Sequence, residues 1–293
     1  MTVQTPSGLV YACLTHVPLW IEFPPYVTPL YMGQAQGEGK LNLRDLAPEW
    51  EPHHAVLGGC VGSFALKNLV LKQYPEATRV GVCQYRKFIS RERISGVAEP
   101  SYPVMDMVYK ERLAGDVFAR VLDPGDQPLL ISRPLPLPKG ATVLTQYKGA
   151  HHVEDLLRFV ALAVELGVLD KDDVEPFFDA TVFFPGGIEL GVYPATFWLQ
   201  HITGIESVVR ACVQTHPQPR SGYQTRAWAF CAERLGSYLL LKHLRSTEPT
   251  QRWIKRLGGM QGIPSDKRCI GQMNVITERD GAGYTLGTSG PGA

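Results

Sequence analysis

The chain has 293 residues, 44% of them hydrophobic and 19% charged, which is the composition of a globular protein and excludes a disordered one. Its 29 Lys and Arg residues nearly balance its 28 Asp and Glu residues, so no global field recruits nucleic acid or anionic lipid and any anion site must be local. The sequence shows no signal peptide and no stretch near the roughly 20 apolar residues of a membrane span. We expect a cytoplasmic protein without nucleic-acid partners, and peripheral membrane association is compatible with this prediction.

The cysteines lie in apolar contexts, without the paired spacing of a disulfide framework or a zinc site. Scattered cysteines of this kind are typical of the reducing cytoplasm. We therefore expect reduced thiols at Cys13, Cys60, Cys83, Cys212, Cys231 and Cys269.

The first third of the chain alternates strand and helix patterns. Apolar runs at residues 8–16 and 26–34 predict two buried strands, and residues 33–54, which show no period, predict a long loop. A glycine-led apolar pattern over residues 58–75 predicts a helix, and another apolar run begins at residue 78. Strand, helix and strand in this order predict an α/β fold with a central, mostly parallel sheet flanked by helices.

The middle of the chain is less regular. Residues 101–122 predict a loop followed by a helix, and residues 127–140 predict a short strand that leads into a polyproline-like connection. Residues 180–194 predict two strands joined by a Pro-Gly-Gly turn.

Three helical patterns fill most of the rest. Residues 151–169 are amphipathic, and residues 195–216 and 225–245 predict the helical C-terminal portion. We find no repeat and no linker between independent units. We therefore expect a single domain over residues 1–282 and a disordered tail over residues 283–293.

Tyr85, Arg86 and Lys87 follow the strand that begins at residue 78. In an open α/β sheet, ligands collect beyond the carboxyl ends of the strands. A guanidinium binds phosphate in a bidentate way, so this strand end could hold a diphosphate. The alternative is a surface cation pair that caps the strand, and spacing alone favours it.

The stretch Gly58-Gly59-Cys60-Val61-Gly62 fits the nucleophile elbow of hydrolases, with cysteine in place of serine. Only three apolar residues precede it, too few for the required central strand. A glycine-rich helix start with a buried Cys60 is the favoured interpretation, and its backbone amides could approach a phosphate. In a hydrolase, the base would be His151, His152 or His201.

His151 and Asp155 lie four residues apart at the predicted start of the 151–169 helix, and so would share one helix face. Such a pair could orient a sugar hydroxyl or act as a general base. A helix cap beside a surface histidine is an equally good interpretation. Later in the chain, Glu233 and Arg234 interrupt an apolar helix, either on its exposed face or pointing inward.

Four blocks occur in order over roughly residues 9 to 245: "YVTPLYMGQ", "ALKN" one helix before "VGVCQYRKF", "TVLTQYKGAHHVEDL" and "RAWAFCAERL". Together they resemble the bacterial capsular and exopolysaccharide glycosyltransferases long catalogued as a domain of unknown function. That family is marked by a strand ending in His-Tyr-Arg-Arg after a Trp-Lys-Asn helix end, a Tyr-x-x-x-His-x-x-x-Asp-Leu helix start and a late Glu-Arg-Leu helix.

The resemblance implies a GT-A-like (Rossmann-type) fold, a nucleotide-diphosphate sugar as donor substrate, and a glycan or lipid-linked acceptor in surface polysaccharide synthesis. It implies Asp155 as the first choice for the catalytic base, Glu233 as the second, and His151 as a group that orients the acceptor or the base. The residues implied near the donor are Asn68, Gln84, Tyr85, Arg86, Lys87, Tyr147 and Arg234.

The chain departs from the family pattern at three positions. Gln84 stands in place of histidine, Lys87 in place of the second arginine, and Leu66 in place of tryptophan. In related GT-A enzymes an Asp-x-Asp triplet at this strand end usually binds a divalent metal. Here the cations would replace it, so neither Mn²⁺ nor Mg²⁺ is expected as a cofactor. A catalytically silent binding module and a Cys60-dependent hydrolase stay as alternatives.

Overall fold

The computed structural model describes residues 8–92, 94, 98–102, 105–216, 220–247 and 254–263. Its main sheet has ten strands. On one side of that sheet β3 (Leu41–Asn42), β2 (Val27–Tyr31), β1 (Leu9–Thr15) and β4 (Arg79–Gln84) run parallel to one another. The predicted α/β fold with a mostly parallel, helix-flanked sheet is confirmed.

The other side of the sheet is mixed. The chain leaves β4 through a tight turn at Tyr85 and Arg86 and returns antiparallel as β5 (Lys87–Ser90). Beyond β5 lies a strand from the end of the described chain, β12 (Leu257–Gly262), which also pairs with β7 and β8. The remaining strands of this sheet are β6 (Ala98–Tyr102), β7 (Met105–Met107), β8 (Ile131–Ser132) and β11 (Gly191–Pro194). A separate two-stranded sheet consists of β9 (Leu135–Pro136) and β10 (Val182–Phe183).

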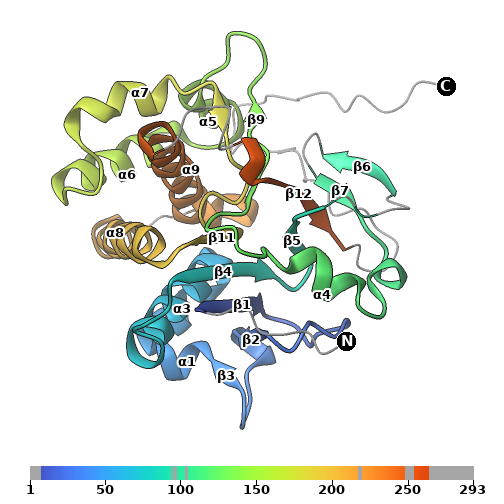
Figure 1. Cartoon of the computed structure of the whole chain (residues 1–293). Helices are drawn as coiled ribbons and strands as arrows, with labels where there is room; N and C mark the ends of the chain where they lie inside the picture. Colours follow the sequence, from blue (N-terminus) through green and yellow to red (C-terminus); the bar gives the residue numbers. More distant parts are fainter. Residues whose placement is uncertain are drawn as a thin grey trace.

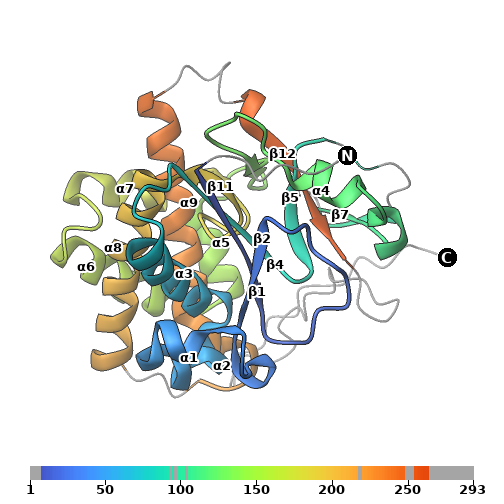
Figure 2. The ribbon, with the colours of Figure 1, turned by 60° about the horizontal axis from the view of Figure 1, so that its bottom comes forward.

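The long helices gather on one face of the sheet, whereas α4 (Val117–Leu122) lies on the other (Figures 1 and 2). The former are α3 (Gly59–Gln73), α5 (Val143–Ala150), α6 (Val153–Glu165), α8 (Ala195–Thr215) and α9 (Ala227–Thr247). Short helices are α1 (Leu43–Leu46), α2 (His54–Leu57) and α7 (Val174–Phe178). Within the described ranges, none of the helices has the length and apolar character to cross a membrane.

Two apolar cores sandwich the sheet because successive strand side chains point to opposite faces. Ala12 and Leu14 of β1 pack into the core beneath the helices, while Tyr11 and Cys13 pack into the core that contains Phe118 of α4. The five cysteines in the described part are buried free thiols, as predicted, and Cys269 lies outside it.

The sequence prediction was wrong in two stretches. Residues 33–54 are not one long loop, since they contain β3, α1 and two 3-10 helices, Gly33–Ala35 and Pro48–His53, and end at the first residue of α2. Leu43 and Trp50 are buried there without a repeating pattern. In the 101–122 segment the predicted helix is present as α4, but the predicted loop before it contains the end of β6, β7 and the 3-10 turn Lys110–Leu113.

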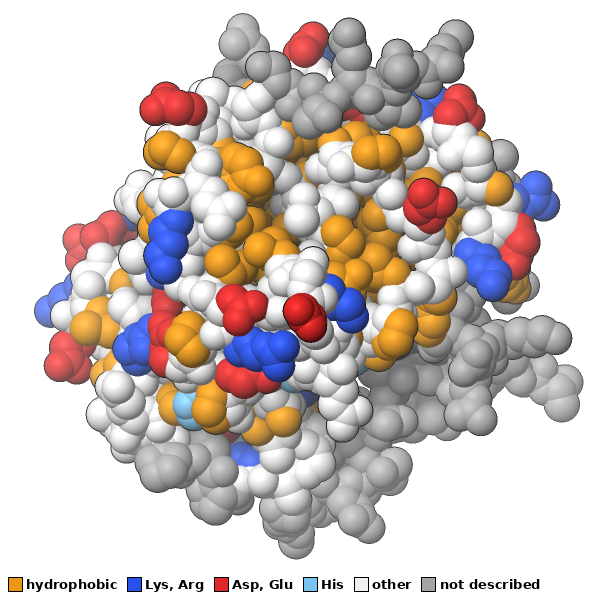
Figure 3. All heavy atoms as spheres, turned by 90° about the horizontal axis from the view of Figure 1, so that it is seen from below, with side chains coloured by type: hydrophobic (Ala, Val, Ile, Leu, Met, Phe, Trp, Pro, Cys, Tyr) orange, Lys and Arg blue, Asp and Glu red, His pale blue; other side chains and the backbone are white. Residues whose placement is uncertain are grey.

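The single domain over residues 1–282 stays a prediction, and the proposed tail at 283–293 lies outside the described residues. On the face shown in Figure 3, acidic and basic side chains are interspersed around hydrophobic ones. This distribution agrees with the near-neutral composition.

Candidate functional site

A cavity of ≈ 1220 Å³ opens where β1 and β4 end. Its wall includes His16 after β1, residues 84–87 around the β4–β5 turn, and Gly58 and Gly59 at the start of α3. The opposite wall comes from α9 and from the 185–190 segment that precedes β11. The cavity therefore lies at the carboxyl ends of parallel strands, the position at which ligands collect in open α/β sheets.

The β4–β5 turn explains how two adjacent cations can serve one cavity. Gln84 and Lys87 are paired directly across the hairpin, so their side chains lie on the same face, and Arg86 lies in the turn between them. All three line the cavity. Tyr85 also lines it but is only 7% exposed, packed edge-on against His16 at 5.0 Å and beside Trp20 at 5.5 Å.

Arg226 adds a third cation, which sequence reasoning missed. It ends the 3-10 turn before α9, and its Nη2 would lie 2.8 Å from a Cβ on Gly58. Gly58 has φ +55°, so both its backbone and this close approach require glycine. The Nε atom of Arg226 is buried without a hydrogen-bond partner among the described residues.

The cations influence each other. Burial lowers the pKa of Lys87, and Arg86 and Arg226 act in the same direction against the opposing effect of Glu233. Burial also lowers the pKa of His16, again with a contribution from both arginines. Crowded positive groups in a partly desolvated space are the electrostatic setting in which a polyanion binds well.

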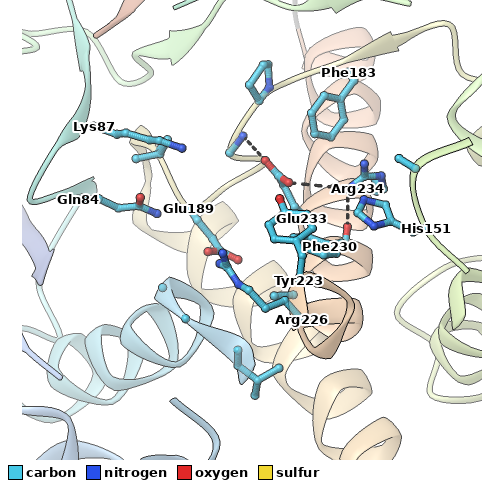
Figure 4. A pocket seen from close by; sticks show the side chains of 18 of the residues that line it. Gln84, Lys87, His151, Phe183, Glu189, Tyr223, Arg226, Phe230, Glu233 and Arg234 are labelled. Carbon is cyan, nitrogen blue, oxygen red and sulfur yellow. Dashed lines mark hydrogen bonds and ion pairs between the residues drawn. The ribbon is translucent and has the colours of Figure 1, made fainter. Parts of the chain in front are cut away.

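Two carboxylates face the same cavity. Glu233 of α9 accepts a hydrogen bond from the Gly186 amide at 2.7 Å, lies 3.8 Å from Arg234 Nη1, and keeps 32% of its side chain exposed. Glu189, on the segment before β11, was missed by the sequence analysis. Its pKa is raised to about 8 by burial and by the nearby Glu233, while Cys60 and Arg226 oppose the shift. In Figure 4, Gln84 and Lys87 approach the cavity from the sheet and Glu233 approaches from α9.

His151 and Arg234 line the cavity within a packed aromatic wall (Figure 4). The His151 ring stacks on Phe230 at 4.3 Å and its Nδ1 lies 3.2 Å from Gln224 Oε1. Burial lowers the pKa of His151 to about 3, so its imidazole is neutral. Arg234 donates to the Phe230 carbonyl at 3.0 Å and to Gln146 Oε1 at 3.1 Å. Both side chains hold the wall in place.

Three sequence-predicted residues do not line the cavity. The Asp155 side chain is 1% exposed and accepts a hydrogen bond from Arg220 at 3.3 Å. The Tyr147 hydroxyl lies 3.2 Å from Cys231 Sγ, and Asn68 donates to the Leu46 carbonyl at 2.8 Å. These contacts tie neighbouring elements together, and their roles in binding or catalysis stay predictions.

The His151–Asp155 pair does not share a helix face, contrary to the sequence prediction. His151 ends α5 with an extended backbone (φ −143°, ψ 178°), and α6 begins two residues later at Val153. The chain bends between the two side chains, so their four-residue spacing carries no helical geometry.

Cys60 is the second residue of α3, and α2 rather than a strand precedes it. A nucleophile elbow requires a strand there, so the glycine-rich helix start is confirmed. Burial raises the pKa of the Cys60 thiol well above its usual value, and Glu189 raises it further. A thiol that resists ionisation is a poor nucleophile, which disfavours the hydrolase alternative.

A metal site was not expected at the strand end. Within the part of the chain that the structure describes, no group of three or more His, Cys, Asp or Glu side chains is arranged to hold a metal ion. Activity and donor affinity after exhaustive EDTA treatment, with and without added Mn²⁺, test the prediction that donor binding needs no divalent cation.

Comparison with known proteins gives a structural likeness. No protein-family model and no curated protein match the sequence. The structure is similar to that of WbbM, a bifunctional glycosyltransferase solved in the apo state, with a TM-score of 0.67 at 14% sequence identity. The match covers 88% of this chain but 45% of the WbbM chain, so this chain spans less than half of that protein. The likeness shows a glycosyltransferase-like fold.

Proposed function

We propose that this protein is a glycosyltransferase that moves a sugar from a nucleotide-diphosphate sugar to a glycan or lipid-linked acceptor in surface polysaccharide synthesis. One observation carries the proposal: a cavity whose cationic lining includes Arg86, Lys87 and Arg226 lies at the strand ends of a fold that resembles a solved glycosyltransferase. Because folds host many functions, the cavity rather than the fold must supply the chemical argument.

Arg86, Lys87 and Arg226 would bind the diphosphate of the donor. They line one cavity, and in the described chain none of them has a carboxylate within ion-pair distance. A diphosphate would satisfy these charges and the buried Nε of Arg226. The same cations would stabilise the negative charge that develops on the departing diphosphate.

Glu233 is the best-placed base of the cavity. In an inverting transfer, the acceptor hydroxyl oxygen bonds to the anomeric carbon while the bond from that carbon to the diphosphate oxygen breaks. The diphosphate leaves with the electron pair, and the hydroxyl proton passes to Glu233. The Gly186 amide fixes one carboxylate oxygen and Arg234 lies near the other, so the group is oriented yet still exposed to the cavity. Asp155, the first choice from sequence, has no such exposure.

Thermal-shift measurements with UDP-, GDP-, CMP- and dTDP-sugars test this proposal, followed by assays of donor hydrolysis and transfer. We expect at least one nucleotide sugar to raise the melting temperature and to be hydrolysed slowly without acceptor. If a nucleotide sugar binds but is neither hydrolysed nor transferred to any of a range of acceptors, the result would instead support a catalytically silent binding module. Gln84 in place of the family histidine is compatible with that alternative. No binding of any nucleotide sugar would contradict the proposal.

A further inference from the structure

The segment that carries Glu189 is held firmly against α9. A Cβ on Gly187, which has φ +54°, would lie 2.6 Å from the Glu233 carbonyl oxygen, so the segment packs directly on the helix backbone. The buried Trp198 indole donates to the Ile188 carbonyl at 3.0 Å, next to Glu189 in the chain. A backbone fixed in this way limits the positions that the Glu189 side chain can take, which favours discrimination between ligands.

Gln84 and Glu189 both approach the first residue of α3. A Cβ on Gly59 would lie 3.1 Å from Gln84 Nε2 and 3.8 Å from Glu189 Oε2. We name these two side chains the Gln84–Glu189 corner. It lies beside the cations of the β4–β5 turn and on the same cavity as Glu233.

The chemistry of the corner suits hydroxyl groups. An amide carries both donors and acceptors, and a protonated carboxyl does too, which matches sugar hydroxyls that also donate and accept. Three charged or titratable groups affect Glu189: Glu233 of α9, Arg226 of the preceding 3-10 turn and Cys60 of α3. With burial, their combined effect favours the neutral carboxyl near pH 7, and a neutral group does not repel a neighbouring diphosphate.

We propose that the Gln84–Glu189 corner recognises hydroxyl groups of the transferred sugar, so that the donor is a hexose with free hydroxyls and Glu189 is a specificity-determining residue. This inference rests on the proposed function, because it assumes that the cations hold the diphosphate of the same donor. It assigns the two cavity carboxylates different tasks: Glu233 takes the proton and Glu189 binds the sugar.

The test compares each nucleotide sugar with its own nucleoside diphosphate. Calorimetry gives dissociation constants for UDP, UDP-glucose and UDP-galactose, and for GDP and GDP-mannose, with wild type, Glu189→Ala, Glu189→Gln and Gln84→Ala. Glu165→Gln, at an exposed site at the end of α6, is the matched control. For the hexose that binds best, Glu189→Ala should weaken nucleotide-sugar binding about tenfold more than diphosphate binding, as expected for the loss of a buried hydrogen-bond partner.

Glu189→Gln should keep that selectivity within about threefold, because its amide offers the same donor and acceptor pair. Gln84→Ala should reproduce the loss from the other side of the corner, and it serves as the test if Glu189→Ala does not fold. An equal loss for both ligands, or an unchanged ratio in both alanine variants, would overturn the inference while the proposed function stands. If wild type binds none of these ligands or the other nucleotide sugars, the proposed function fails, and this inference fails with it.

Discussion

The β4–β5 turn and the α5–α6 junction carry neighbouring blocks of the same family resemblance, yet they have opposite surroundings. The turn presents Gln84, Arg86 and Lys87 to the cavity. The junction buries its polar groups, with Asp155 against Arg220 and His151 against Phe230. The blocks of the resemblance therefore contain both groups that line the cavity and groups that are buried in its surroundings. Burial and pairing distinguish the two.

The largest effect should come from Glu233, the exposed carboxylate of the cavity. Glu233→Gln keeps the size of the side chain but removes its basicity, so turnover should fall at least about a hundredfold, the scale of general-base catalysis. Donor affinity should change little. Steady-state kinetics measures turnover and the dependence on donor concentration, with the nucleotide sugar that the thermal-shift measurements identify as the donor. Near-normal turnover in Glu233→Gln, with a large loss in a folded Asp155→Asn, would return the base to the α5–α6 junction.

Arg86→Ala should weaken nucleoside-diphosphate binding about 10- to 150-fold, because a hydrogen bond to a charged group contributes about 1.5–3 kcal/mol. The free nucleoside lacks the charge and should bind wild type and variant alike. Calorimetry measures the dissociation constants of the nucleoside diphosphate and the free nucleoside for the same variant, so the nucleoside serves as the control. An equal loss for the two would make Arg86 a structural residue of the turn.

Asp155→Asn should lower stability more than chemistry. Its carboxylate is buried against Arg220, which is itself 18% exposed, so the neutral amide should cost about 2 kcal/mol of unfolding free energy. Asp170→Asn is the matched control, since Asp170 pairs with Lys242 at the surface and is 72% exposed. That change should cost about 0–1 kcal/mol. Urea denaturation compares the two, and equal losses would mean that the buried pair has no special role.

The sequence predicted the features that depend on local pattern. The apolar runs in β1 and β4 and the helix between them are continuous in the chain, and they were enough to place Arg86 and Lys87 at a strand end. The hairpin itself was not predictable, because no Gly, Pro or Asn marks the turn at Tyr85 and Arg86.

The rest of the site depends on contacts between distant segments. Arg226 and Glu189 reach the cavity from the C-terminal half. Arg226 opens the block "RAWAFCAERL", but no local pattern singled out either residue as part of the site. The glycine-rich β12 was also missed, since glycine is unfavourable in strands. Glycine is present in this strand because of close packing: a Cβ on Gly258 would lie 2.5 Å from the Ser90 carbonyl oxygen of β5. Only the folded arrangement shows why glycine is needed there.

The pH dependence of stability should report the buried state of His151. Its pKa is lowered to about 3 by burial, whereas an unfolded histidine titrates near 6.5, so below that pH the unfolded chain takes up a proton that the folded chain does not. Its contribution to stability is complete above pH 6.5 and declines as the pH falls. Between pH 7 and 5, wild type should lose about 2 kcal/mol more than His151→Phe. Parallel pH profiles would show that His151 titrates freely.

The smallest effect should come from Cys60, which lies beside the cavity but is not needed for the proposed reaction. The thiol is 1% exposed, and burial and Glu189 both disfavour its ionisation. Cys60→Ser retains the shape and a hydroxyl that can still bond to Glu189, so turnover should stay within about threefold, with a stability cost of about 1 kcal/mol. Mass spectrometry should find Cys60 unmodified when the native protein is exposed to iodoacetamide, because only the thiolate reacts. Loss of all turnover in a folded Cys60→Ser, together with labelling of Cys60 by an electrophilic ester, would instead identify a hydrolase whose nucleophile is the Cys60 thiol.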